Sequence, residues 1–519
     1  MSKTMNYSSQ IRRVMLIFPP YSPCTTLVAW EPMITTPMGI AYLASAVREA
    51  GYEVACLDAG AEAPYQETAI NETVSRFGLT YDQIMDKIAA WQPDLVGISC
   101  IFSNQWPATR ELAKRIKAAD PDVIVAAGGG HPTFLSELCM QDAPLDFIIR
   151  GEGEESFVDL LNRMRKGRAL DGVDGLVYRD GDSIRTNPKV SLIEDLDSIA
   201  FPAHDLLDPK RYFKIALPMG YSMMSPRSVP VVTSRGCSCL CTFCSSTQMW
   251  GKRYRTRSAA NVLRELDWLV DKFGIEEIKV QDDNLTVNRK RAMEIFRGMI
   301  ERPYRLRWNT PNGLAVWTLD REMLTAMKDS GCYEISMAIE SGNPKVLKDL
   351  IRKPLNLDKA REVNKIAREL GIFRIAYFIL GFPGETKEQI MDTIKFSREL
   401  RLDLSSIFIF NPLPGSELFK ECLKRGYITE KSFFDVGNQF FSSAIDSDEW
   451  TAKEIEGKIR WEYFRNYLAI FRSPFLLGRC YCKAFRYHPR YIKFFLLRTA
   501  RAIRLKWMKG AVRQNPLQY

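Results

Sequence analysis

The stretch that decides the fold of this chain is Arg235-Gly236-Cys237-Ser238-Cys239-Leu240-Cys241-Thr242-Phe243-Cys244. Within it, Cys237, Cys241 and Cys244 form a CxxxCxxC pattern. Three thiolates at this spacing can bind three irons of a cubane cluster and leave the fourth iron open, whereas an electron carrier usually closes all four positions. A zinc loop is the alternative, but it needs a fourth Cys or His. Only Cys239 lies inside the loop, and we interpret it as a thiol that binds no metal.

The bulk composition is that of a globular protein, with 519 residues, 46% of them hydrophobic, which is enough for about three domains. No run of 18 apolar residues appears, and residues 1–10 lack the apolar core of a signal peptide. We therefore expect a cytoplasmic protein whose 12 Cys remain reduced. With three His, a His-rich zinc or di-iron site is nearly excluded.

The net charge of +10 is concentrated at the carboxyl end, because residues 461–519 hold 13 Lys and Arg against one acid. Within this tail, Ile492, Phe495, Leu496, Ile503 and Trp507 share one side at helical spacing. A basic amphipathic helix of this kind can lie in an anionic membrane interface. The alternative is a helix packed on the body of the protein. No RNA-binding module is present in the sequence, so we expect no nucleic-acid partner.

The first unit, residues 11–161, alternates short apolar runs with helical segments, which predicts a parallel, doubly wound sheet. In such sheets ligands bind at the carboxyl ends of the strands. A connector, residues 162–228, follows and contains a hairpin around Arg179-Asp180-Gly181-Asp182. The expected strands of the first unit are 14–18, 53–57, 95–100, 123–127 and 147–149.

The second unit, residues 229–427, repeats a strand and a helix six times, which predicts an open (β/α)6 version of the eightfold barrel. The cysteine stretch follows its first strand, at the end where barrels of this type carry their chemistry. Residues 428–519 form a helical and basic third region. The expected barrel strands are 229–234, 275–282, 305–309, 334–339, 374–380 and 406–410.

Four further motifs follow the barrel strands in order: QDDN at 281–284, IESG at 339–342, GFPGET at 381–386 and PLPGS at 412–416. With CxxxCxxC, they resemble the radical S-adenosylmethionine (SAM) superfamily. The resemblance implies a 4Fe-4S cluster on the three Cys and a SAM site near it. The basic stretch 250–258 either meets an acidic group of SAM or substrate, or is solvated. The SAM-binding residues implied are Phe243, Asp282, Asp283, Asn284, Glu340, Ser341, Gly381, Pro383 and Gly384.

The first unit resembles the cobalamin-binding domain that precedes the barrel in one class of these enzymes. The Asp-x-His-x-x-Gly motif of older cobalamin proteins is missing, so we expect cobalt without a His ligand from that loop, and His131 is read as a polar turn residue. A nucleotide-binding or vestigial sheet is the alternative. The cobalamin-binding residues implied are Pro19, Pro20, Met38, Gly39, Gly128, Gly129, Gly130, His131, Gly151, Glu152 and Gly153.

The resemblance implies that the cluster cleaves SAM to a 5′-deoxyadenosyl radical and that cobalamin supplies a methyl group to an unactivated carbon of a small-molecule substrate. The amphipathic tail is the reason to consider a lipid-like substrate. A one-electron reductant of the flavodoxin or ferredoxin type is the implied partner. A radical cyclase or oxidase of the tetrapyrrole-ring type is the enzymatic alternative. An iron–sulfur carrier or a cobalamin sensor is the non-enzymatic one.

Overall fold

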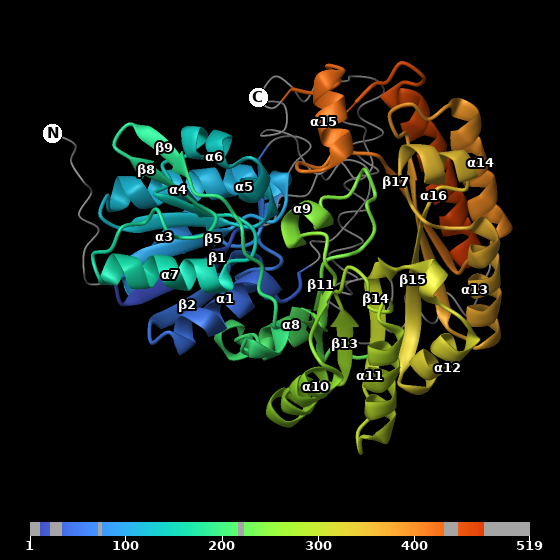
Figure 1. The fold of residues 1–519 in the computed structure, drawn as a ribbon, viewed down its shortest axis with the longest axis horizontal. Coiled ribbons are helices and arrows are strands. Elements are labelled where there is room, and N and C mark those ends of the chain that lie inside the picture. The colour runs from blue at the N-terminus through green and yellow to red at the C-terminus, as the bar shows by residue number, and fades with distance from the viewer. Residues whose placement is uncertain (1–10, 21–33, 71–74, 216–222, 430–444, 472–519) are drawn as a thin grey trace.

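The computed structural model describes residues 11–20, 34–70, 75–215, 223–429 and 445–471. Two sheets lie side by side along the chain (Figure 1). The first has strand order β2-β1-β5-β6-β7-β8-β9, and the second has order β10-β13-β14-β15-β16-β17. The expected fold class, a doubly wound domain followed by a partial (β/α)6 barrel, is confirmed.

The first sheet is parallel from β2 to β7, with β8 and β9 added antiparallel at its edge. The hairpin expected in the connector is therefore part of this sheet, which continues past residue 161. The strands are β1 (Arg13–Phe18), β2 (Glu53–Asp58), β5 (Leu95–Ser99), β6 (Ile124–Gly128), β7 (Phe147–Ile149), β8 (Leu176–Asp180) and β9 (Ser183–Thr186), with a separate pair β3 (Glu67–Ala69) and β4 (Ser75–Phe77).

Helices cover the first sheet where the sequence predicted them. Thr80 begins α3 with a capping box, because its hydroxyl accepts from the Gln83 amide while the Gln83 side chain accepts from the Thr80 amide. The helices are α1 (Met38–Glu49), α2 (Ala59–Glu62), α3 (Tyr81–Trp91), α4 (Trp106–Ala119), α5 (Gly130–Phe134), α6 (Ser136–Asp142) and α7 (Glu154–Arg165), and the connector adds α8 (Pro209–Ile215).

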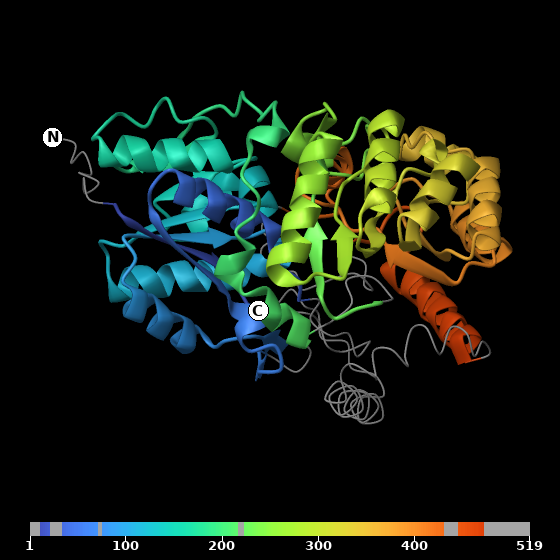
Figure 2. The same ribbon diagram turned by 90° about the horizontal axis from the view of Figure 1, so that it is seen from below.

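All six strands of the second sheet run parallel, and helices line its outer side (Figure 2). A short antiparallel pair, β11 (Ser234–Arg235) and β12 (Arg255–Thr256), closes the cysteine stretch into a loop. The long strands are β10 (Ser228–Val231), β13 (Glu277–Val280), β14 (Arg307–Leu314), β15 (Cys332–Glu340), β16 (Phe373–Leu380) and β17 (Leu404–Ile409). The helices are α9 (Ser246–Trp250), α10 (Ala259–Phe273), α11 (Arg289–Glu301), α12 (Arg321–Asp329), α13 (Leu357–Glu369), α14 (Lys387–Glu399), α15 (Glu417–Lys424) and α16 (Ala452–Phe471).

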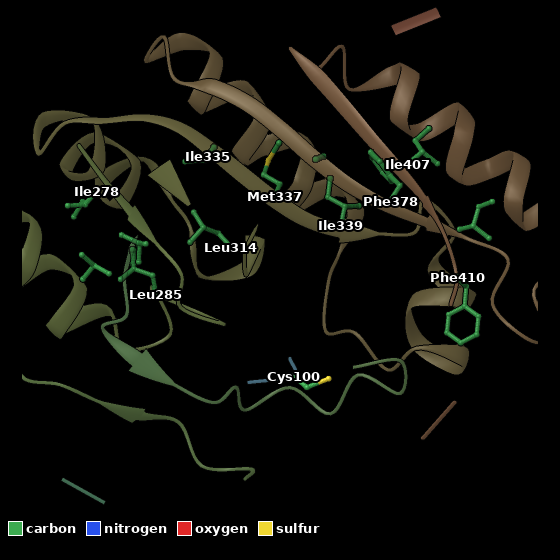
Figure 3. Packing of buried hydrophobic residues seen from close by; sticks show 14 of the residues in the cluster. Cys100, Ile278, Leu285, Leu314, Ile335, Met337, Ile339, Phe378, Ile407 and Phe410 are labelled. Atoms are coloured by element: carbon green, nitrogen blue, oxygen red, sulfur yellow. The ribbon is translucent and has the colours of Figure 1, made fainter. Parts of the chain in front are cut away.

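Polar and apolar side chains alternate along the barrel strands. Ile335 and Met337 of β15 belong to a buried apolar cluster that includes the inner faces of the helices (Figure 3). Glu334 and Ser336 alternate with them and are also buried. Because alternate residues of a strand face opposite sides of the sheet, the polar set faces the inside of the barrel. The interior therefore offers polar groups rather than a closed apolar core.

The basic amphipathic segment 491–507, for which membrane contact and packing on the protein were both left open, lies outside the described residues. Of the third region, α16 is described, and it packs on the last barrel strand, β17. Among the described residues, no helix combines the length and apolarity needed to cross a bilayer.

Candidate active site

The cysteine loop leaves the barrel after β10 and is fastened to two other strand-end loops. Thr242, in the middle of the loop, donates its amide to Ile351 and its hydroxyl to Leu350, beyond β15. The Thr242 carbonyl accepts from the Leu418 amide, beyond β17, at 2.9 Å. The loop is therefore braced on both sides before any metal binds.

Each of Cys237, Cys241 and Cys244 is a half-buried free thiol. Burial raises the pKa of Cys241 to about 11 and that of Cys244 to about 12. The Cys239 backbone amide lies 3.5 Å from Cys237 Sγ, and hydrogen bonds from Cys239 lower the pKa of Cys237.

No group of three or more His, Cys, Asp or Glu side chains in the described ranges converges tightly enough to hold a single metal ion. A mononuclear zinc site needs that convergence, because all of its ligands bind one ion at about 2.0–2.3 Å. A cubane cluster does not, because each thiolate binds a different iron. The CxxxCxxC spacing provides three thiols for a cubane cluster with one open iron.

Three residues after β13, Asp282, Asp283 and Asn284, lie in different environments. Asp282 is buried, and its carboxylate accepts from the Thr233 amide at 2.6 Å and from the hydroxyls of Thr233 and Ser234. It thereby anchors the start of the cysteine loop. Asp283 accepts from the Ser246 hydroxyl at 2.6 Å, and burial raises its pKa. Asn284 is buried and contributes a hydrogen bond that lowers the pKa of Cys237.

After β15, Glu340 adopts φ +69°, a left-handed conformation that is costly for a residue with a side chain. Its carboxylate pairs with the buried Lys353 ammonium at 3.2 Å. Burial lowers the pKa of Lys353, but the charge and hydrogen bond of Glu340 together with nearby thiols outweigh this effect, and the pKa is raised. Ser341 is also buried, and its hydroxyl bonds with that of Thr393 at 3.0 Å.

The turn after β16 places Gly381 at φ +87° and Gly384 at φ +83°, as a tight strand-to-helix turn requires. Glu385 closes the turn by accepting from the Gly381 amide at 2.7 Å and from the Phe382 amide at 3.0 Å. The Phe382 ring lies 5.7 Å from that of Phe243, which belongs to the cysteine loop. The two motifs therefore meet at one end of the barrel, and Pro383 lies in the same turn.

Glu385 carries a pH-dependent prediction. Burial raises the pKa of Glu385 to about 8 in the folded protein. In the unfolded chain the same carboxyl group loses its proton near its ordinary pKa, so between these two values only the folded protein keeps the proton. The stability contribution of Glu385 therefore falls as pH rises from about 4.5 to 8. Glu385→Gln has no carboxyl group to titrate, so it does not lose stability in this way. We expect the melting temperature of the variant, relative to that of the wild type, to rise as the pH increases from about 4.5 to 8. A difference that is constant between pH 5 and pH 8 would contradict this pKa.

The carboxyl edge of the first sheet brings together the residues assigned to cobalamin. Pro19 and Pro20 follow β1, Gly128 ends β6 with Gly129 and Gly130 directly after it, and residues 151–153 follow β7. At Gly129, φ is +106° and an added Cβ would lie 2.5 Å from the Cys100 carbonyl oxygen, so only glycine fits this crossing of two loops. Met38 and Gly39 begin α1, and no atom lies within 4 Å of a Cβ built on Gly39. The edge is thus a glycine-lined cradle of the kind an open sheet offers to a flat ligand.

Two residues assigned to cobalamin are held by protein contacts. Glu152 is buried and bonds through both carboxylate oxygens to Arg255 and through one of them to Arg235. His131 is 2% exposed, stacks on Trp106 at 5.2 Å, and its Nδ1 lies 2.9 Å from the Ser103 hydroxyl oxygen. Burial lowers the pKa of His131 to about 4. Direct cobalamin contact by either side chain remains a prediction.

The position of His131 predicts the spectrum of bound cobalamin. Since the ring is buried against Trp106 and bonded to Ser103, we expect cobalt to have no nitrogen ligand from the protein. The electron paramagnetic resonance (EPR) spectrum of bound cob(II)alamin should show no nitrogen splitting from His131 and should be unchanged in His131→Gln. Nitrogen splitting that disappears in the variant would contradict this account.

Sequence reasoning missed Lys353 and Arg235 as site residues, and it interpreted the stretch that contains Arg255 as either ligand-binding or solvated. Arg235 stands next to the cysteine motif and Arg255 lies in a basic stretch, but neither pattern shows that the side chain is buried in an ion pair. Lys353 follows Arg352 between two helices, where a solvated pair of cations is the ordinary expectation. Its contact with Glu340 depends on the path of the chain after β15.

Comparison with known proteins agrees with both halves of this site. The B12 binding domain model matches residues 25–161, and the Radical SAM superfamily model matches residues 231–397. The cytidylyl-2-hydroxyethylphosphonate methyltransferase of Streptomyces wedmorensis is 35% identical over 437 residues, which is 78% of this chain and 82% of that protein. An uncharacterized methyltransferase of Pyrococcus horikoshii is 32% identical, over 88% of this chain and 93% of that protein.

Among solved structures, the radical SAM methyltransferase TsrM from Kitasatospora setae, with cobalamin and a 4Fe-4S cluster bound, superimposes with a TM-score of 0.63. The match covers 80% of this chain and 75% of TsrM at 18% identity, so it speaks to the fold. The cysteine loop at one sheet edge, the glycine cradle at the other and the two family models together place this chain in the cobalamin-dependent radical SAM family.

Proposed function

We propose that the protein methylates an unactivated carbon of a small molecule. The observation that carries the proposal is that both cofactor edges meet in one structure. An added Cβ on Gly415, in the loop after β17, would lie 2.5 Å from the Phe134 ring of α5, at the cobalamin edge. Two relatives above 30% identity are methyltransferases by name, which favours methylation over ring closure or oxidation.

The residues fit the two cofactors in different ways. Cys237, Cys241 and Cys244 provide three thiolates for a 4Fe-4S cluster, and the polar barrel interior provides donors and acceptors for SAM. When bound, the cluster and SAM supply radical chemistry and cobalamin carries the methyl group. The chain itself holds the loop through Asp282 and Thr242, and it orients Glu340 through Lys353.

A labelling experiment tests this function. The anaerobically reconstituted protein is incubated with methyl-labelled SAM, a one-electron reductant and candidate small-molecule acceptors. We expect 5′-deoxyadenosine and a product that carries the label. A product without label would contradict methylation and favour the cyclase alternative. Failure to form 5′-deoxyadenosine would contradict the radical mechanism altogether.

A small-molecule substrate and a reductant are the partners that this chemistry requires. For membrane contact, the support is the sequence of residues 491–507, a basic amphipathic pattern that suits an anionic interface. We propose that this segment brings the protein to lipid-like substrates. Co-sedimentation with anionic vesicles should decrease when Phe495 and Trp507 are replaced by Ser, and binding that is unchanged would contradict the proposal.

A further inference from the structure

Four charged side chains, here named the interdomain clasp, join the first sheet to the cysteine loop: Glu152, Glu154, Arg235 and Arg255. The Glu152 Oε1 atom lies 2.8 Å from Arg235 Nη1, and its Oε2 atom lies 2.8 Å from Arg255 Nη1. Arg235 Nη2 bonds to Glu154. Exposed fractions of 1% for the Glu152 side chain, 6% for Arg235 and 3% for Arg255 show that water is excluded from these pairs.

The two arginines occupy a particular place in the barrel. Arg235 and Arg255 are register partners in the β11–β12 pair, and the segment between them contains all three cluster thiols and α9. Arg255 also donates to the Trp250 carbonyl at 3.0 Å, and Arg235 lies 5.4 Å from the Trp250 ring. Any shift of the clasp therefore moves the base of the loop that carries the cluster.

The two glutamates occupy a matching place in the first domain. Glu152 follows β7 within the glycine loop of the cobalamin edge, and Glu154 begins α7. The Glu152 Oε2 atom also accepts from the Ile193 amide at 3.0 Å, which ties the connector to the same point. The backbone carbonyl of Glu152 accepts a hydrogen bond from the Lys189 ammonium at 3.2 Å. The clasp is thus fixed to both cofactor edges and to the connector between them.

The charges of the clasp balance, with two carboxylates against two guanidiniums. Buried ion pairs of this kind add little net stability, because desolvation offsets their attraction, but they penalise every arrangement that separates the partners. Guanidinium and carboxylate also match in a fixed geometry. A balanced, buried and directional contact is suited to holding one relative position of two domains.

We propose that the interdomain clasp is a positioning device that sets the separation between the cluster loop and the cobalamin edge. The proposal rests on the proposed two-cofactor function. In it, Glu152, Glu154, Arg235 and Arg255 are positioning residues that act through the loops that carry them. Loss of the clasp leaves each cofactor bound but lets the distance between them vary.

The test measures that distance in the holoenzyme. Pulsed EPR between bound cob(II)alamin and the reduced cluster is recorded for the wild type, Glu152→Gln and Glu154→Gln. We expect the distance distribution of Glu152→Gln to widen by at least about twofold, because interdomain interfaces allow relative motion once their contacts are weakened. In Glu154→Gln, whose side chain is assigned to neither cofactor, cleavage of SAM to 5′-deoxyadenosine by titanium(III) citrate should change by less than about twofold.

The matched control is Glu194→Gln, because Glu194 and Arg253 form an ion pair at 2.8 Å between the connector and the same barrel loop but are 59% and 72% exposed. Its distance distribution should equal that of the wild type. If Glu152→Gln does not fold, Glu154→Gln decides, since it removes one charge opposite Arg235 and leaves the Glu152 contacts intact. The distance distribution of Glu154→Gln should widen less than that of Glu152→Gln.

The outcomes separate the two proposals. A wild type that binds no cobalamin or forms no 5′-deoxyadenosine contradicts the proposed function. A wild type that does both, with glutamine variants that fold and keep the wild-type distance distribution, overturns the clasp alone.

Discussion

Replacing Cys237, Cys241 or Cys244 by Ala will abolish reductive cleavage of SAM and the absorbance of the reconstituted cluster. With two thiolates, the loop cannot bind three irons, so the cluster is lost rather than weakened. The effect should reach the background of the uncatalysed reaction, because no electron then enters SAM. Quantifying 5′-deoxyadenosine by chromatography after reduction, together with iron and sulfide content, measures both losses.

Cys239→Ala is the control in the same loop. Cys239 donates a hydrogen bond to Cys237 and is not read as an iron ligand. Because mutations next to a metal ligand typically cost about 10–100-fold in affinity or activity, the variant should assemble a cluster and retain measurable cleavage. Loss of the cluster in Cys239→Ala, with retention in Cys237→Ala, would exchange the roles of the two residues.

The largest loss of stability is expected for Glu265→Ala. Glu265 is fully buried in α10 and pairs with the buried Arg257. Removing the carboxylate leaves a guanidinium without its counter-charge, although Arg257 still donates to Asn261 Oδ1 at 2.7 Å and to the Val232 carbonyl at 3.0 Å. The free energy of unfolding should fall by about 3–5 kcal/mol. Urea-induced unfolding followed by circular dichroism measures it.

An exposed pair provides the comparison. Arg361 and Glu399 lie 2.6 Å apart, but their side chains are 42% and 51% exposed. Because water screens such pairs, Glu399→Ala should cost less than about 1 kcal/mol. Equal losses in the two variants would show that burial does not govern these ion pairs.

Both sheets could be predicted from the sequence because their signals are local. The apolar runs at 147–149 and 374–380 match β7 and β16 to within one residue. The antiparallel addition of β8 and β9 to the first sheet could not be predicted, since a hairpin does not encode which edge it joins. Strand β14 also runs to Leu314, five residues beyond the expected end, because Gly313 at φ +97° lets an irregular segment keep its pairing.

In the candidate site, too, the features that are local in the sequence could be predicted and the contacts between distant residues could not. The spacing of Cys237, Cys241 and Cys244 is a local signal and gives the cluster loop directly. The side-chain partners of Asp282 and Glu152 depend on contacts between residues 41–103 positions apart, such as Thr233 with Asp282 and Arg255 with Glu152. Acidic residues at strand ends suggest ligand binding, but only the folded chain shows that these two carboxylates are occupied by protein donors.

The most direct test of a single two-cofactor site is the absorbance spectrum of the anaerobically purified and reconstituted protein, with iron, sulfide and cobalamin quantified in the same sample. The account predicts one 4Fe-4S cluster and one cobalamin per chain, with the cobalt lacking a nitrogen ligand. A protein that binds the cluster but retains no cobalamin would contradict it.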